Sequence, residues 1–102
     1  MATENHPPEK ALTAHDAELA ERRAAAARER AAHAGLSAAR SFEESARIHE
    51  QVARVQDRAV EQGVSHVGAH RESAAQHREF AAEDRKLAEL KRKESEADLV
   101  GD

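Results

Sequence analysis

The chain has 102 residues, no cysteine, and 16 basic against 20 acidic side chains, which leaves a net charge of −4. Disulfides and thiolate metal sites are therefore excluded, and the interleaved charges, which form no basic stripe, predict that nucleic acid is not a partner. Ala occurs 24 times, whereas Leu, Val, Ile and Phe together occur 15 times. Because Ala favours helix but buries little surface, this composition predicts an all-α protein of paired helices with a thin core.

The first third of the chain predicts a short tail and one helix. Residues 1–8 are expected to be a flexible N-terminal tail, with Pro7 and Pro8 in or near the first helical turn. A first helix is expected over residues 9–34, where Ala, Glu and Arg predominate. Gly35 is expected to end it, because glycine commonly follows the last helical residue.

The remainder predicts two further helices. A second helix is expected over residues 38–62, since Ser41 and Glu44 have the spacing of a capping box; Ser37 is an alternative cap one turn earlier. Residues 63–68 contain two Gly and two Val, which makes them the least helical stretch of the chain. A third helix is expected over residues 68–97, before a C-terminal tail at 98–102. Residues 9–97 are thus interpreted as a single helical domain.

A seven-residue repeat runs through the second and third predicted helices, a pattern typical of one helix packing along another. One set of positions holds Phe42, His49, Gln56, Gly63, His70 and His77. The set three residues on holds Ser45, Val52, Ala59, His66, Ser73, Phe80 and Leu87. The set four residues on holds Ala46, Ala53, Val60, Val67, Ala74, Ala81 and Ala88. The small and polar side chains predict close, weak, coiled-coil-like packing, with imidazoles in or beside the contact.

The residues around Glu44 and His49 recur 28 positions later around Glu72 and His77. One interpretation is an antiparallel helical hairpin folded at residues 63–68, on which the first helix packs as a third long helix or from which it projects. The other is one unbroken helix, because the repeat keeps its phase across the glycines. Two Gly would cost an unbroken helix about 2 kcal/mol relative to Ala, which favours the hairpin.

A chain with so few large apolar residues buries little surface as a monomer, so we expect a homo-oligomer. The alternative is that a helix of a partner protein covers these apolar residues. The residues expected in the core or the interface are the large apolar ones of the repeat region: Phe42, Ile48, Val52, Val55, Val60, Phe80, Leu87 and Leu90.

The histidines suggest a second kind of site. His66 and His70 stand four residues apart, a spacing at which two imidazoles can bind one metal ion. His77 lies on the same helical stripe about 10 Å beyond His70, so a second helix or chain would have to supply further ligands. A divalent-metal-binding helical protein that uses His66, His70 and His77 is therefore the alternative hypothesis for function.

Neither catalysis nor a membrane role is predicted. Ser45 and His49, like Ser73 and His77, are four residues apart, but no orienting acid or oxyanion hole accompanies them. No glycine-rich phosphate loop occurs, so we expect no catalytic residue and no cofactor. No apolar run approaches the roughly 18 residues of a membrane span, and the first residues lack an apolar signal segment. The expected location is the cytoplasm.

Two stretches, residues 44–50 (ESARIHE) and 70–85 (HRESAAQHREFAAEDR), resemble segments of the small Ala/Glu/Arg/His-rich helical proteins of high-GC actinobacteria. Similar segments there accompany GAF–ANTAR-type regulators. The resemblance covers about residues 41–90 and implies a regulatory or stress-associated accessory protein; it assigns no functional residue. We therefore expect a non-enzymatic helical interaction or scaffold protein that self-associates or docks a partner helix.

Overall fold

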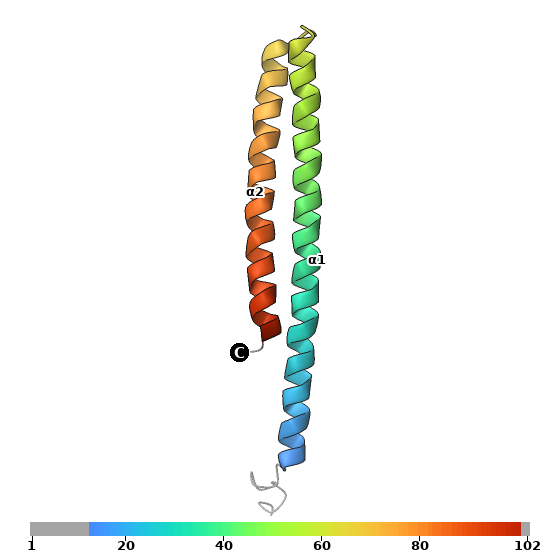
Figure 1. The fold of residues 1–102 in the computed structure, drawn as a ribbon, viewed down its shortest axis with the longest axis vertical. Coiled ribbons are helices and arrows are strands. Elements are labelled where there is room, and N and C mark those ends of the chain that lie inside the picture. Colours follow the sequence, from blue (N-terminus) through green and yellow to red (C-terminus); the bar gives the residue numbers. More distant parts are fainter. Residues whose placement is uncertain (1–12, 101–102) are drawn as a thin grey trace, which may run out of the picture.

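The computed structural model describes residues 13–100, which form two long helices joined by a short turn (Figure 1). Helix α1 spans Ala14–Glu61 and helix α2 spans Val67–Val100. The helices run antiparallel and side by side, and the N-terminal part of α1 extends beyond the end of α2. Residues 13–100 contain no β-strand and form a helical hairpin rather than one unbroken helix. The chain measures 88 × 29 × 14 Å.

Helix α1 begins at a capping box that the sequence interpretation missed. The Thr13 hydroxyl accepts a hydrogen bond from the backbone N–H of Asp16, and the Asp16 carboxylate accepts one from the backbone N–H of Thr13, both at 3.1 Å. Each side chain thus satisfies a backbone donor that the first helical turn leaves free. The start expected at residue 9 and the tail at 1–8 lie outside the described residues.

The expected division into three helices is wrong, because α1 continues through Gly35 and Ser41 without a break. A single glycine costs a helix only about 1 kcal/mol relative to Ala, and the residues around this one are strong helix formers. The absence of a side chain at Gly35 also serves the packing. A Cβ atom there would lie 2.0 Å from the hydroxyl of Ser95 on α2.

The turn lies where the sequence predicted it, within residues 62–69. Gly63 has φ +66°, and the N–H groups of Gly63 and Val64 bond to the carbonyls of Val60 and Ala59 at 3.1 and 3.0 Å. These are the two hydrogen bonds of a Schellman motif, in which glycine supplies the left-handed conformation. Helix α2 then begins at Val67, one residue before the predicted start.

The C-terminal end of α2 also differs from the expectation. The tail expected at 98–102 is helical as far as Val100, and residues 101 and 102 lie outside the described part. Within residues 13–100, neither helix is long and apolar enough to cross a membrane.

The contact between the helices, called the seam below, consists of small residues at seven-residue intervals. Its buried members are Ala32, Ala39, Ala46 and Ala53 on α1 and Ala74, Ala81, Ala88 and Ser95 on α2. Among the described residues no large side chain is fully buried. Small residues let two helix backbones approach closely, but each removes little apolar surface from water. The hairpin is therefore thin and has no thick hydrophobic core.

Candidate interaction surface

One flank of the seam is ionic. Four positions after Ala39, Ala46 and Ala53 on α1 stand acidic residues, and four positions after the seam alanines of α2 stand arginines. These residues pair across the hairpin: Glu43 with Arg92, Glu50 with Arg85 and Asp57 with Arg78. The first two pairs have N···O distances of 2.7 and 2.6 Å. The partners stand 49, 35 and 21 positions apart in the sequence, so each pair lies one heptad nearer the turn than the one before.

The outermost of these pairs also has an electrostatic consequence. The hydrogen bond that Arg92 donates to Glu43, together with the charge of Glu43, raises the pKa of the Arg92 guanidinium above its usual value. Because the residues of the ionic flank are acidic on α1, basic on α2 and spaced by heptads, a shift of one helix along the other by less than a heptad would separate the opposite charges.

Between the flanks, the seam holds two polar contacts whose partners come from different helices. The Nδ1 atoms of His49 and His77 are 2.7 Å apart, so one ring donates its N–H to the other. One heptad nearer the turn, Gln56 Oε1 accepts a hydrogen bond from His70. The predicted placement of imidazoles in or beside the helix contact therefore holds for His49, His70 and His77.

Asp84 lies beside the paired histidines. Its Oδ2 atom is buried, is 3.9 Å from Nε2 of His49, and has no hydrogen-bond partner among residues 13–100. Phe80 packs against the same rings, with centroid distances of 5.4 Å to His49 and 6.1 Å to His77. This part of the seam therefore places a carboxylate, two imidazoles and an aromatic ring in contact.

The predicted core residues do not form the interior of the hairpin. Phe42, Val52 and Val60 are half-buried, but the other five are exposed. Their exposed fractions are 52% for Ile48, 49% for Val55, 46% for Phe80, 42% for Leu87 and 56% for Leu90. The expectation that they form a core within one chain is wrong, because the seam is too narrow for side chains larger than Ala.

These exposed residues and Val52 all lie away from the ion-pairing positions of their own helix. Val52, Phe80 and Leu87 each precede a seam alanine by one position and lie beside the seam, on the flank opposite the ion pairs. Ile48, Val55 and Leu90 each follow a seam alanine by two positions and point away from the facing helix, so that Ile48 and Val55 lie on the outer side of α1 and Leu90 on the outer side of α2. Since each residue advances about 100° around a helix, both sets are turned roughly 150° from the ion-pairing positions. We call Ile48, Val52, Val55, Phe80, Leu87 and Leu90 the apolar flank.

The three histidines of the metal hypothesis are not brought to one point. His66 lies in the turn, is exposed and has φ +67°, whereas His70 bonds to Gln56 and His77 to His49. Within residues 13–100 there is no group of three or more His, Cys, Asp or Glu side chains placed to hold a metal ion. The geometry therefore gives the metal hypothesis no site.

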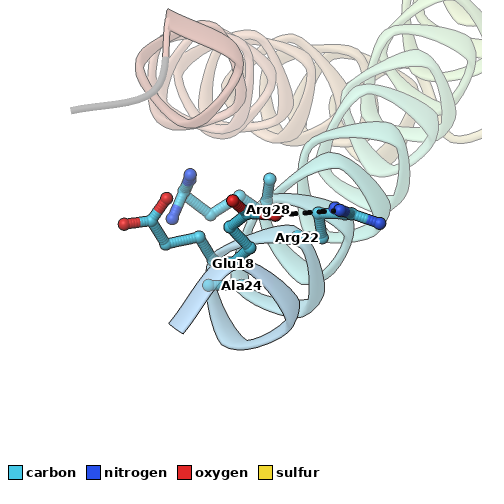
Figure 2. Close-up of a pocket in the computed structure, with 6 residues that line it drawn as sticks. Glu18, Arg22, Ala24 and Arg28 are labelled. Atoms are coloured by element: carbon cyan, nitrogen blue, oxygen red, sulfur yellow. Dashed lines mark hydrogen bonds and ion pairs between the residues drawn. The ribbon is translucent and has the colours of Figure 1, made fainter. Parts of the chain in front are cut away.

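The hollows on the described surface are open ones. Figure 2 shows one near the N-terminal end of α1, lined by residues of α1 alone, among them Glu18, Arg22, Ala24 and Arg28. Glu18 and Arg22 form an ion pair of 3.4 Å one helical turn apart. A second hollow brings Ala25, Arg28 and Glu29 together with Asp98 and Leu99, which marks where α2 ends alongside α1.

Comparisons with known proteins give no relative for this chain: no family model, no curated protein and no solved structure matches it.

The ionic flank was a functional feature that the sequence interpretation missed. Acidic residues at heptad intervals on one side of the predicted turn, and arginines at heptad intervals on the other, were a readable signal. The ion pairs show that this side of the hairpin makes contacts within the chain, whereas the large apolar residues lie on its other sides.

Proposed function

We propose that this chain is a non-enzymatic helical interaction protein that uses its apolar flank to dock another helix, belonging either to a second copy or to a partner protein. Docking requires no reacting group and no cofactor, in keeping with a surface of aliphatic and aromatic side chains. The regulatory or stress-associated role implied by the sequence resemblance is one setting for such a protein.

The observation that carries this proposal is the separation of the two flanks. The charged residues beside the seam are paired within the chain, and six large apolar residues lie away from these pairs, four of them 46% exposed or more. Singly scattered apolar residues are ordinary on a protein surface, but Ile48, Val52 and Val55 are contiguous along one face of α1, and a contiguous group is typical of an interaction site. Their spacing of three and four positions is that of a helix presented to another helix.

The proposal is tested by placing a photoreactive amino acid at Val55 on the apolar flank and, as a matched control, at its exposed neighbour Arg54. Crosslinking is carried out in cells that produce the full chain, and the crosslinked proteins are identified by mass spectrometry. We expect a discrete adduct from position 55 and not from position 54. The same probe at position 55 in the Ile48→Glu/Leu90→Glu variant should give no such adduct, because the two carboxylates would have to be desolvated in the contact.

An identified adduct that depends on the apolar flank supports the proposal, whether the captured chain is a second copy or another protein. Equal labelling from positions 54 and 55, or an adduct that survives the two glutamates, contradicts it. Circular dichroism of the purified variants verifies that both helices are retained.

A further inference from the structure

Three residues of the apolar flank, Ile48, Val52 and Val55, belong to an uncharged face that runs along α1. Taking positions at alternating steps of three and four from residue 17 to residue 62, every residue is uncharged. The face has small side chains in its N-terminal half and the large ones in its C-terminal half: Ala17, Ala20, Ala24, Ala27, Ala31, Ala34, Ala38, Ser41, Ser45, Ile48, Val52, Val55, Ala59 and Gln62.

The part of α1 that extends past α2 keeps this face free of charge. Helix α2 ends beside residues 25–29, so residues 14–24 have no α2 residue alongside (Figure 1). There the position that continues the seam is charged and exposed, as Glu18. The uncharged face continues through Ala17, Ala20 and Ala24. The small seam residues therefore end where α2 ends, whereas the uncharged face continues beyond that point.

The exposed surface is larger than that of a compact protein of the same mass. The chain exposes 7850 Å², whereas a compact protein of its mass exposes about 5,700 Å². The difference, about 2,000 Å², exceeds the roughly 800 Å² that each partner buries in a stable dimer of standard size. A second hairpin laid on the apolar flank removes area of this order from water without any change in the fold.

We infer that the occupant of this face is a second copy of the chain, with α1 packed antiparallel against α1 of the other copy about a two-fold axis between Ala38 and Ser41. This inference rests on the proposed function, because it names the helix that the apolar flank docks. A two-fold contact requires a face complementary to itself. The reversed face meets that condition: Ile48, Val52 and Val55 lie opposite Ala31, Ala27 and Ala24 of the other copy.

The antiparallel direction follows from this match of large with small. A parallel pair would set Ile48 against Ile48 and Ala24 against Ala24, leaving the helices wedged apart at one end. The antiparallel pair also covers the projecting part of each α1 with the turn-proximal half of the other.

The test uses the absence of cysteine from the chain. The double variant Ala24→Cys/Val55→Cys places two thiols about 46 Å apart on one helix, so they cannot bridge within a chain. In the inferred dimer each meets the other copy's thiol, and mild oxidation should give a covalent dimer that reduction reverses. The matched control, Ala24→Cys/Arg54→Cys, moves one thiol about 100° around α1 and should stay monomeric on a non-reducing gel. Sedimentation equilibrium of the cysteine-free chain is measured in parallel.

A dimer by sedimentation together with crosslinking of the first variant alone supports the inference. A parent chain that stays monomeric at all attainable concentrations overturns it, and so does crosslinking by both variants alike. The single variant Val52→Cys adds a direct check of direction, because its thiols meet only in a parallel pair; a covalent dimer of that variant overturns the antiparallel arrangement. If the chain does not dimerise but gives a flank-dependent photoadduct to a different protein, the inference is contradicted and the proposed function is supported. If neither a dimer nor a flank-dependent photoadduct is found, both are contradicted.

Discussion

The two flanks of the hairpin have the same heptad spacing but opposite chemistry. On one flank, acidic side chains of α1 pair with arginines of α2, so every charge there has a counter-charge within the chain. On the other, Ile48, Val55 and Leu90 are about half exposed and have no comparable partner on the facing helix among the described residues. The difference indicates that the ionic flank sets how the chain folds on itself, and the apolar flank is the side directed at another molecule.

The largest effect is expected from placing charge on the apolar flank. Ile48→Glu/Val55→Glu should weaken association on the order of 100-fold, because each carboxylate loses water without gaining a partner. The control on the ionic flank is Glu50→Gln/Arg85→Gln, which removes one ion pair and should leave the dissociation constant nearly unchanged. Sedimentation equilibrium measures both. Equal weakening by the two variants would remove the distinction between the flanks.

A smaller effect, confined to the hairpin itself, is expected at the turn. Gly63→Ala should lower the free energy of unfolding by about 1–2 kcal/mol, because the residue has φ +66° and an L side chain is disfavoured there. Gly68→Ala is the matched control: its added Cβ also meets open space, but it lies within α2, so the helix gains about 0.5–1 kcal/mol. Urea unfolding at fixed protein concentration measures both. The two variants are expected to change the free energy of unfolding in opposite directions. If both variants are destabilised, the cost comes from the added methyl group and not from the backbone conformation of Gly63.

The seam between the flanks supplies the next test. Asp84→Ala should raise the unfolding free energy by about 1 kcal/mol, because it removes a buried carboxylate oxygen that lacks a hydrogen-bond partner. Thermal melts of the parent and the variant measure the difference. A variant less stable than the parent would show that the carboxylate already has a stabilising partner.

The smallest effect is expected on the ionic flank. Glu50→Arg or Arg85→Glu alone should cost about 0.5–1 kcal/mol, whereas the two together restore an oppositely charged pair and most of the stability. High salt should shrink the difference between single and double variants, because the side chains are 37% and 47% exposed. Chemical unfolding at two salt concentrations provides the measurement. Purely additive losses would mean that the pair does not interact.

The parts of the fold that could be predicted from sequence are those with local causes. The turn was predicted from Gly63 and its neighbours, and the heptad spacing predicted three sets of positions along the helix contact, one of which holds the buried alanines from Ala46 to Ala88. The break at Gly35 was wrongly predicted because the use of that glycine, its close approach to Ser95, is a contact between residues far apart in the sequence.

The candidate site was predicted in its residues but not in its placement. Phe80, Ile48 and Leu90 were selected as large apolar residues of the repeat, but a periodic sequence offers several parallel stripes. Size alone suggested that the largest side chains lie inside, whereas in the hairpin the smallest ones do, because only Ala and Ser fit the seam. The heptads of opposite charge on the two helices were the signal that distinguishes the inner stripe from the outer one.

The regular spacing of the ion pairs has a consequence for how this molecule can change in length. Because every cross-helix pair is repeated one heptad further along, removing seven residues from each helix would leave the remaining partners facing one another in a hairpin about 10 Å shorter. Removing a single residue from one helix would instead turn everything beyond it by about 100° and separate all the outer pairs at once. The hairpin therefore tolerates insertions and deletions only when both helices change by the same whole number of heptads.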